Sequence, residues 1–201
     1  MLKQVTLLVC GGMHPPSYTG QILAVIARDA VLSRHSQVVC ASQGGLGVLS
    51  PFALRQAIDR QATSYSEKSA AEVAPSALII WAFSAGCVGA AALATHWQQY
   101  RGRVLALFMA DGWGVPRDPG VPVHRLSHDP ITHATSRWLG AGDDDFYADP
   151  AVPHLTLWQQ PQRATGWAIA PGQVRQSLTA AEFLCGRSRD HIARYQSLDE
   201  G

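Results

Sequence analysis

The segment with the clearest chemical potential is residues 82–86 (Ala-Phe-Ser-Ala-Gly), which overlaps the most apolar run of the chain, residues 77–83. A serine with small neighbours at a sharp strand-to-helix turn fits the nucleophile-elbow pattern Gly-x-Ser-x-Gly, here with Ala82 in place of the first glycine. Such a turn exposes the hydroxyl of Ser84, which could attack a carbonyl carbon if a histidine accepted its proton. A serine that only caps a helix gives the same pentapeptide, so the motif needs partners elsewhere in the chain.

With this motif the chain resembles the α/β-hydrolase superfamily, in particular small serine esterases without a cap domain, such as the cutinases. The resemblance runs from the first strand candidate to about Trp158. It implies a serine nucleophile after a central strand, an acid after a later strand and then a histidine, in that chain order. Ser84 fills the first position.

The acid that the resemblance implies is Asp129, in residues 121–131 (Val-Pro-Val-His-Arg-Leu-Ser-His-Asp-Pro-Ile). This segment looks like the late strand of the family, which ends in Asp followed by Pro and an aliphatic residue. A carboxylate there would fix the tautomer of the histidine and stabilise its protonated form. Asp111 is the alternative, because some relatives take the acid one strand earlier. Asp-Pro also begins ordinary turns.

The histidine that the resemblance implies is His154, in residues 151–158 (Ala-Val-Pro-His-Leu-Thr-Leu-Trp). The segment is similar to the Pro-His-Leu sequence around the catalytic histidine of cutinase-like esterases. Enough chain separates it from Asp129 for one helix and a short return to the sheet edge. Residues 143–149 (Asp-Asp-Asp-Phe-Tyr-Ala-Asp) make a poor strand, so we expect the last strand of the family to be shortened or missing.

An oxyanion hole needs two backbone N–H groups that point at the carbonyl oxygen as it gains charge. Ala85, the residue after the nucleophile, would supply one. The second is expected from residues 10–16 (Cys-Gly-Gly-Met-His-Pro-Pro), which look like the oxyanion loop of the family. Met13 is the preferred donor and Gly12 the next, because proline has no N–H.

The elements that must position these residues follow an alternating pattern. Strand candidates at 4–10, 36–41, 77–83, 103–110 and 121–126 are separated by helix candidates, which include 20–34, a helix opened by Ser50-Pro51, a helix that continues to about Tyr100, and 172–188. Strands that are apolar on both faces and alternate with helices predict a mostly parallel sheet covered on both sides. The fold class is therefore a three-layer α/β/α sandwich, and ligands are expected beyond the carboxyl ends of its strands.

Composition sets wider limits on function. The chain has 201 residues, 47% of them apolar and 15% charged, and a formal charge of +1. We expect one domain over residues 1–201, with neither nucleic acid nor an anionic membrane as a partner. The apolar run that ends at Gly11-Gly12 is too short to span a membrane and does not look like a signal peptide, which favours a cytoplasmic location. Four cysteines, Cys10, Cys40, Cys87 and Cys185, lack metal-type spacing and are expected to be free and mostly buried thiols.

Three alternatives stay open. Metal-dependent hydrolysis could use His124, His128, Asp129 and His133, although Pro122 and Pro130 argue against the helix that usually presents such pairs. Nucleotide binding is disfavoured because neither Gly-rich turn, 11–14 or 44–47, matches a phosphate-binding motif. A non-catalytic descendant of the hydrolase fold that binds a small ligand or a protein partner is the main competitor.

The sequence therefore predicts a serine hydrolase that cleaves a small-molecule ester or thioester without a cofactor or metal. Ser84 would be the nucleophile, His154 the base and Asp129 the acid. No room exists between Met109 and Val121 for a helical cap, so the site is expected to be open. Aromatic residues near the strand ends could line an acyl pocket: Phe83, Trp113, Trp138, Tyr147 and Trp158. The sequence does not indicate the oligomeric state.

Overall fold

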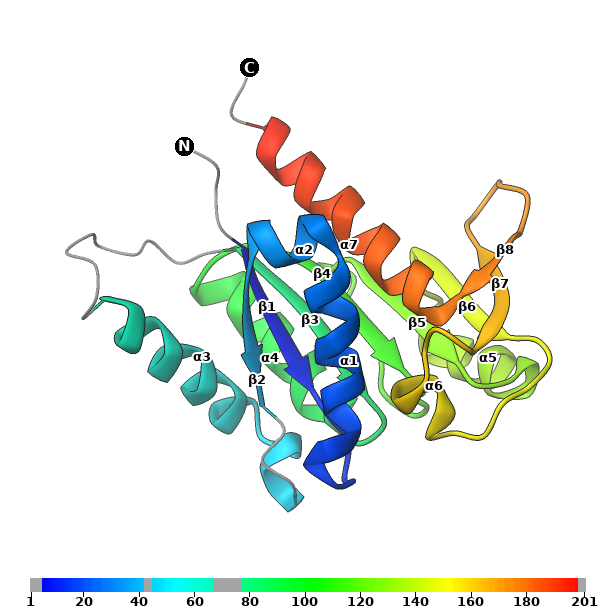
Figure 1. The fold of residues 1–201 in the computed structure, drawn as a ribbon, viewed down its shortest axis with the longest axis horizontal. Helices are drawn as coiled ribbons and strands as arrows, with labels where there is room; N and C mark the ends of the chain where they lie inside the picture. The colour runs from blue at the N-terminus through cyan, green and yellow to red at the C-terminus, as the bar shows by residue number, and fades with distance from the viewer. Residues whose placement is uncertain (1–4, 42–44, 67–76, 199–201) are drawn as a thin grey trace.

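A computed structural model describes residues 5–41, 45–66 and 77–198, and Figure 1 shows its arrangement. Eight strands form one sheet in the order β2-β1-β3-β4-β5-β6-β7-β8. Neighbouring strands from β2 to β6 are parallel, whereas β7 and β8 run antiparallel to their neighbours. The strands are β1 (Val5–Cys10), β2 (Ser36–Cys40), β3 (Ala77–Phe83), β4 (Val104–Ala110), β5 (Val123–Ser127), β6 (Asp144–Ala148), β7 (Thr165–Ile169) and β8 (Gln176–Thr179).

Helices cover both faces of this sheet, and Figure 1 shows α1, α2 and α7 on the side opposite α4. The helices are α1 (Pro16–Arg28), α2 (Ala30–His35), α3 (Pro51–Ser66), α4 (Gly86–Tyr100), α5 (Pro130–Ser136), α6 (Thr156–Gln159) and α7 (Ala180–Ser197), with 3-10 turns η1 (Gly45–Leu49) and η2 (Arg137–Leu139). The expected three-layer α/β/α architecture with a mostly parallel sheet is confirmed.

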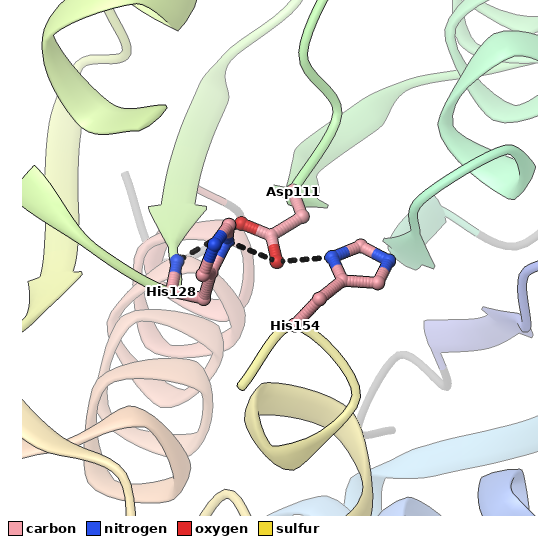
Figure 2. Close-up of side chains that lie close together, drawn as sticks. All are labelled: Asp111, His128 and His154. Carbon is pink, nitrogen blue, oxygen red and sulfur yellow. Dashed lines mark hydrogen bonds and ion pairs between the residues drawn. The ribbon is translucent and has the colours of Figure 1, made fainter. Parts of the chain in front are cut away.

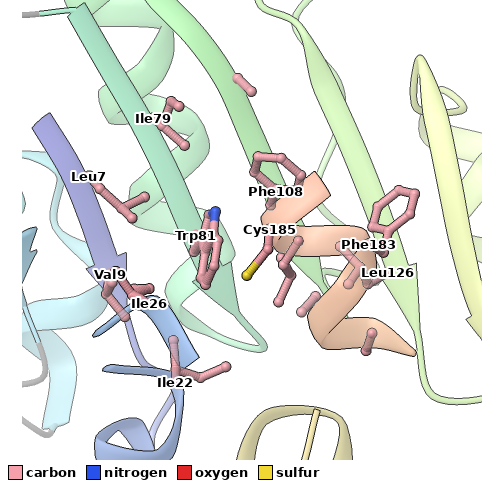
Figure 3. Close-up of a cluster of buried hydrophobic side chains, with 14 of the residues drawn as sticks. Leu7, Val9, Ile22, Ile26, Ile79, Trp81, Phe108, Leu126, Phe183 and Cys185 are labelled. Atoms are coloured by element: carbon pink, nitrogen blue, oxygen red, sulfur yellow. The ribbon is translucent and has the colours of Figure 1, made fainter. Parts of the chain in front are cut away.

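Two apolar cores lie on the two faces of the sheet, because successive side chains of a strand point to opposite sides. One core joins alternate residues of β1, β3 and β4 to α1 and α7, and Figure 3 shows Trp81 and Phe108 near its centre. The other core packs the remaining strand residues against α3 and α4. Since β1, β3 and β4 are buried on both faces, the sheet is a rigid base for the loops at its edge.

Ordinary capping explains where several helices begin. The expected helix over residues 20–34 is instead two helices, because Asp29 leaves helical geometry and its side chain accepts the N–H groups of Val31 and Leu32 at the start of α2. Ser50 caps α3 as expected, accepting a hydrogen bond from the N–H of Ala53. The turn predicted at 44–47 and the polar stretch at 63–74 lie partly outside the described residues.

The C-terminal part of the fold differs most from the sequence prediction. Residues 143–149 do contain a strand, β6, which pairs with β5, so the last parallel strand is present. Residues 172–188 are not one helix. They contain the edge strand β8 and the first half of α7, which starts at a capping box between Thr179 and Glu182. The hairpin of β7 and β8 was not predicted.

Other sequence predictions have mixed outcomes. Cys10, Cys87 and Cys185 are buried free thiols, as expected, whereas Cys40 is exposed. Within the described residues, no helix has both the length and the apolar character needed to cross a bilayer. The single-domain organisation and the cytoplasmic location stay predictions.

Candidate active site

Ser84 lies in the turn that joins β3 to α4, at the carboxyl end of a central strand. Its backbone has a φ of 52°, in the left-handed region that side chains other than glycine rarely occupy. The Ser84 N–H donates to the carbonyl of Ala110 at 2.8 Å, which ties the turn to the end of β4. This strained strand-to-helix turn is the geometry that the pattern in residues 82–86 predicts, and it leaves the hydroxyl half-exposed.

Gly86, two residues after the serine, is small for a packing reason. A Cβ atom on Gly86 would lie 2.4 Å from the carbonyl oxygen of Gly11, which belongs to the backbone just after β1. Glycine therefore lets the start of α4 approach the β1–α1 loop closely. This close approach holds the serine turn and the predicted oxyanion loop together.

His154 lies in the loop between β6 and α6, and it reaches Ser84 across the end of the sheet. Its Nε2 is 3.2 Å from the Ser84 Oγ. Its ring stacks on Phe83, with 4.7 Å between ring centroids and an interplanar angle of 27°. Phe83 stacks in turn on the buried Trp158 at 5.3 Å. The aromatic stack fixes the plane of the imidazole beside the serine hydroxyl.

Asp111, and not Asp129, is the carboxylate that contacts this histidine. Asp111 follows β4, and its Oδ2 lies 2.7 Å from the Nδ1 of His154. Its backbone φ is 50°, which makes Ser84 and Asp111 the two non-glycine residues with positive φ among the described parts of the chain. The Asp111 side chain is only 2% exposed. The structure therefore brings together Ser84, His154 and Asp111, the alternative acid of the sequence analysis.

The prediction that Asp129 contacts the histidine is not supported by this geometry. Asp129 is the N-cap of α5, and its Oδ1 accepts the N–H of Thr132 at 2.6 Å. Its Oδ2 accepts the Thr132 hydroxyl and lies 2.7 Å from the Nε2 of His128. Partial burial raises the pKa of Asp129, but the Thr132 hydrogen bonds and the nearby His128 lower it more, so the net pKa lies below the usual value. The Asp129 carboxylate is thus held by its own helix and by His128.

His128 also lies in this site, although its contact with Asp111 was not predicted from the sequence. Its Nδ1 lies 3.0 Å from the Oδ2 of Asp111, and its backbone N–H donates to the Oδ1 of the same carboxylate at 2.9 Å. Figure 2 shows the Asp111 carboxylate between the rings of His128 and His154. One feature of the sequence could have indicated this contact: His128 directly precedes Asp129 at a strand end. The sequence prediction treated His128 only as a possible metal ligand.

The β1–α1 loop is organised by a second histidine that the sequence analysis did not single out. The Nε2 of His14 accepts the N–H of Gly12 at 3.0 Å, and the His14 Nδ1 lies 2.9 Å from the carbonyl of Pro15. These contacts fit one neutral tautomer, with the proton on Nδ1. The N–H of Gly12 is thus turned toward its own loop. Of the two predicted donors from this loop, Met13 is the one left available.

The predicted aromatic lining divides into buried and exposed residues. Phe83 and Trp158 are each 1% exposed, so they support His154 from the core instead of forming a pocket wall. Tyr147 stacks against His133. Trp113 and Trp138 are 66% and 81% exposed.

The metal site considered from sequence is not formed as a cluster within the described residues, because His128 and Asp129 contact each other while His124 and His133 contact other residues. The ring of His124 contacts His191 at 2.8 Å, and His133 stacks on Tyr147. A different set, Asp111, His128 and His154, offers ligand atoms that lie within 4.8 Å of one another. Its hydrogen bonds already satisfy the facing atoms, since the Asp111 Oδ2 accepts from both rings. We therefore describe this set as a hydrogen-bonded network.

Comparisons with known proteins give fold-level likeness only. Neither a protein-family model nor a curated protein sequence matches the chain. One similar solved structure is a cutinase-like protein from Cryptococcus sp., with 13% identity over 54% of this chain and 53% of that one, and a TM-score of 0.37. Another is the enterobactin esterase of Shigella flexneri, with 12% identity over 69% of this chain and 43% of that one, and a TM-score of 0.44. The chain thus spans about half the length of each, and likeness this weak carries no functional argument.

Proposed function

We propose that the protein is a serine hydrolase of the α/β-hydrolase type that cleaves a carboxylic ester or thioester. The observation that carries this proposal is the continuous contact from Ser84 Oγ to His154 Nε2 at 3.2 Å and from His154 Nδ1 to Asp111 Oδ2 at 2.7 Å. A nucleophile, a base and a group that orients the base are the three parts that acyl transfer by serine requires. The strained turn at Ser84 adds support, because backbone strain concentrates at functional sites.

The geometry supports a two-step reaction. The Ser84 Oγ attacks the carbonyl carbon while its proton moves to the Nε2 of His154, which gives a tetrahedral oxyanion. When this intermediate collapses, the bond to the leaving alcohol or thiol breaks, and His154 returns the proton to that leaving group. Water then attacks the acyl-serine and loses a proton to His154. When this second intermediate collapses, the bond to Ser84 Oγ breaks, His154 returns the proton to that oxygen, and the acid leaves. Asp111 keeps the His154 proton on Nδ1 and stabilises the imidazolium.

The oxyanion would be stabilised by two backbone N–H groups. Ala85 begins the turn into α4 directly after the serine and is the first proposed donor. Met13 is the second, because the Gly12 N–H already donates to His14. Removing a single donor of this kind typically costs about 100- to 1000-fold in kcat. No cofactor or metal takes part in this mechanism.

An open site favours a short acyl chain or an accessible ester as the substrate. The His154 side chain is 43% exposed while it contacts Ser84. The segment between β4 and β5, residues 111–122, consists of turns and loops without a helix that could cover the serine. We therefore propose a small-molecule ester or thioester instead of a long-chain lipid enclosed by a lid.

A fluorophosphonate probe, which reacts covalently with an activated serine, tests the proposal. We expect the natural protein to be labelled at Ser84, and Ser84→Ala to remain unlabelled. The exposed residue His96, on α4, gives a control variant, His96→Asn, that should label like the natural protein. If the natural protein resists labelling at high probe concentration while it remains folded, the hydrolase proposal is overturned in favour of a non-catalytic binding protein.

A further inference from the structure

The hydrogen-bonded chain does not end at the acid of the proposed triad. Asp111 Oδ2 lies 2.7 Å from the Nδ1 of His154 and 3.0 Å from the Nδ1 of His128, and the two rings meet edge to face. On its far side, the Nε2 of His128 lies 2.7 Å from the Oδ2 of Asp129. The order is therefore Ser84, His154, Asp111, His128 and Asp129, with the carboxylates from the ends of neighbouring strands β4 and β5 joined by one imidazole.

Counting protons along this chain defines the state of each ring. An ionised carboxylate only accepts hydrogen bonds, so both Nδ1 atoms that face Asp111 must carry protons. For His154 this leaves Nε2 free to accept the hydroxyl proton of Ser84. For His128 it leaves Nε2 only 2.7 Å from a second carboxylate oxygen, a distance at which two lone pairs would repel. One more proton must lie between His128 and Asp129.

The surroundings of Asp129 decide where that proton lies. Its carboxylate accepts both the N–H and the hydroxyl of Thr132. These two hydrogen bonds favour the ionised form of the carboxylate. The proton therefore belongs to the ring, and both nitrogens of His128 donate.

We propose that His128 is a positioning residue of the active site, held as an imidazolium between two carboxylates so that it orients Asp111 toward His154. Only the expected effect of His128 on the rate of hydrolysis rests on the proposed hydrolase function. The backbone N–H of His128 donates to one oxygen of Asp111 and its ring to the other, so the carboxylate is held at both oxygens. A carboxylate held in this way keeps the His154 ring in the orientation that Ser84 needs.

The charge of His128 has a second consequence for the reaction. The titratable groups in contact with it are Asp111 from the end of β4, Asp129 from the start of α5 and His154 from the loop before α6. With His128 charged, His154 faces a group of net charge −1 and not −2. The imidazolium that forms on His154 during the proposed reaction therefore faces one uncompensated negative charge and not two.

Nitrogen NMR of histidine-labelled protein tests the protonation state without any need for activity. We expect both ring nitrogens of His128 to be protonated at pH 7.5, because each faces a carboxylate oxygen that can only accept a hydrogen bond. His128→Asn assigns the signals, and Asp129→Asn should release the second proton. If His128 is neutral at pH 7.5 in the natural protein, the proposal is wrong, whatever the enzyme does.

Kinetics then test the positioning role, with p-nitrophenyl acetate as the probe substrate. The amide of His128→Asn can still donate toward Asp111 but carries no charge, whereas His128→Ala removes both. We expect His128→Ala to lower kcat by about 10- to 100-fold. His128→Asn should recover part of that loss, because its amide restores a hydrogen bond to Asp111 that alanine cannot make. Unchanged kcat in both variants, as in the control His96→Asn, would overturn the role.

Discussion

Ser84 and Asp111 end adjacent parallel strands in the same left-handed backbone conformation, with φ of 52° and 50°. Each donates its backbone N–H to a carbonyl near the end of the next strand along the sheet. Ser84 donates to Ala110 and Asp111 to Leu126, both at 2.8 Å. The same local device therefore repeats at the ends of β3 and β4. It lifts both side chains out of the sheet edge toward His154, and the sheet hydrogen bonds hold the strain.

Replacing Asp111 and Asp129 separately by asparagine distinguishes their roles. Asp111→Asn keeps the shape of the side chain but cannot hold the required tautomer of His154, so kcat on p-nitrophenyl acetate should fall by about 10,000-fold. Asp129→Asn acts only through His128 and should cost about tenfold or less. Circular dichroism confirms that both variants fold. A larger loss for Asp129→Asn would restore Asp129 as the acid.

The backbone strain at Ser84 should lower the free energy of unfolding by a measurable amount. Ser84→Gly relieves the left-handed conformation and Ser84→Ala keeps it, so the glycine variant should have the higher free energy of unfolding, by about 1 kcal/mol. Ser33 is an exposed residue of α2, where glycine is unfavourable, so Ser33→Gly should be less stable than Ser33→Ala by about 0.5–1 kcal/mol. Urea unfolding measures both pairs. The same sign at both positions would argue against strain at Ser84.

The close approach of α4 to the β1–α1 loop predicts a large effect from one methyl group. Gly86→Ala places a Cβ 2.4 Å from a backbone oxygen of Gly11 and should destabilise the fold by about 1–3 kcal/mol, with reduced probe labelling of Ser84. Gly20, in α1, has open space at its Cβ position, so Gly20→Ala should stabilise the fold by about 0.5–1 kcal/mol. Equal stability of the two variants would contradict this packing argument.

Acid sensitivity is expected from a pair of histidines at the opposite end of β5, of which His124 is buried and His191 half-buried. Burial lowers the pKa of His124 and of His191 to about 4, and the His124 ring further disfavours a charge on His191. The unfolded chain, with ordinary histidine pKa values near 6.5, binds protons that the folded chain excludes. The free energy of unfolding should therefore have its full value above about pH 6.5 and fall as the pH drops toward 4.

Urea unfolding between pH 7 and pH 4.5 checks this dependence. His191→Gln should show a shallower loss of stability with acid than the natural protein, because one depressed pKa is removed. His96→Gln, at an exposed position, should leave the slope unchanged. Stability that is equal at pH 7 and pH 5 in the natural protein would rule out the neutral histidine pair.

Local sequence was sufficient to predict that Ser84 and His154 lie together, but not which carboxylate contacts His154. The small neighbours of Ser84 and the Pro-His-Leu segment at His154 identify these two residues because their constraints are local. Asp111 and Asp129 both end strands at the same edge, so sequence leaves two carboxylates in competition. Tertiary contacts decide between them: α5 binds the carboxylate of Asp129, while the turn at Asp111 directs its carboxylate toward His154.

The C-terminal hairpin could not be predicted for a related reason. Strand β8 is short, polar and half-exposed at the sheet edge, so its residues carry no apolar alternation. Pairing with β7 defines it, together with the capping box that starts α7. Likewise, β6 has a poor strand sequence, but pairing on both sides makes it a strand.

By itself, the sequence determined the layered α/β architecture, the turn at Ser84 and the order of serine and histidine along the chain, because apolar periodicity and small-residue turns act over a few residues. Only the tertiary structure decided which carboxylate contacts His154 and that His128 lies between Asp111 and Asp129. Those relationships depend on distances between strand ends, which the packing of the whole sheet sets.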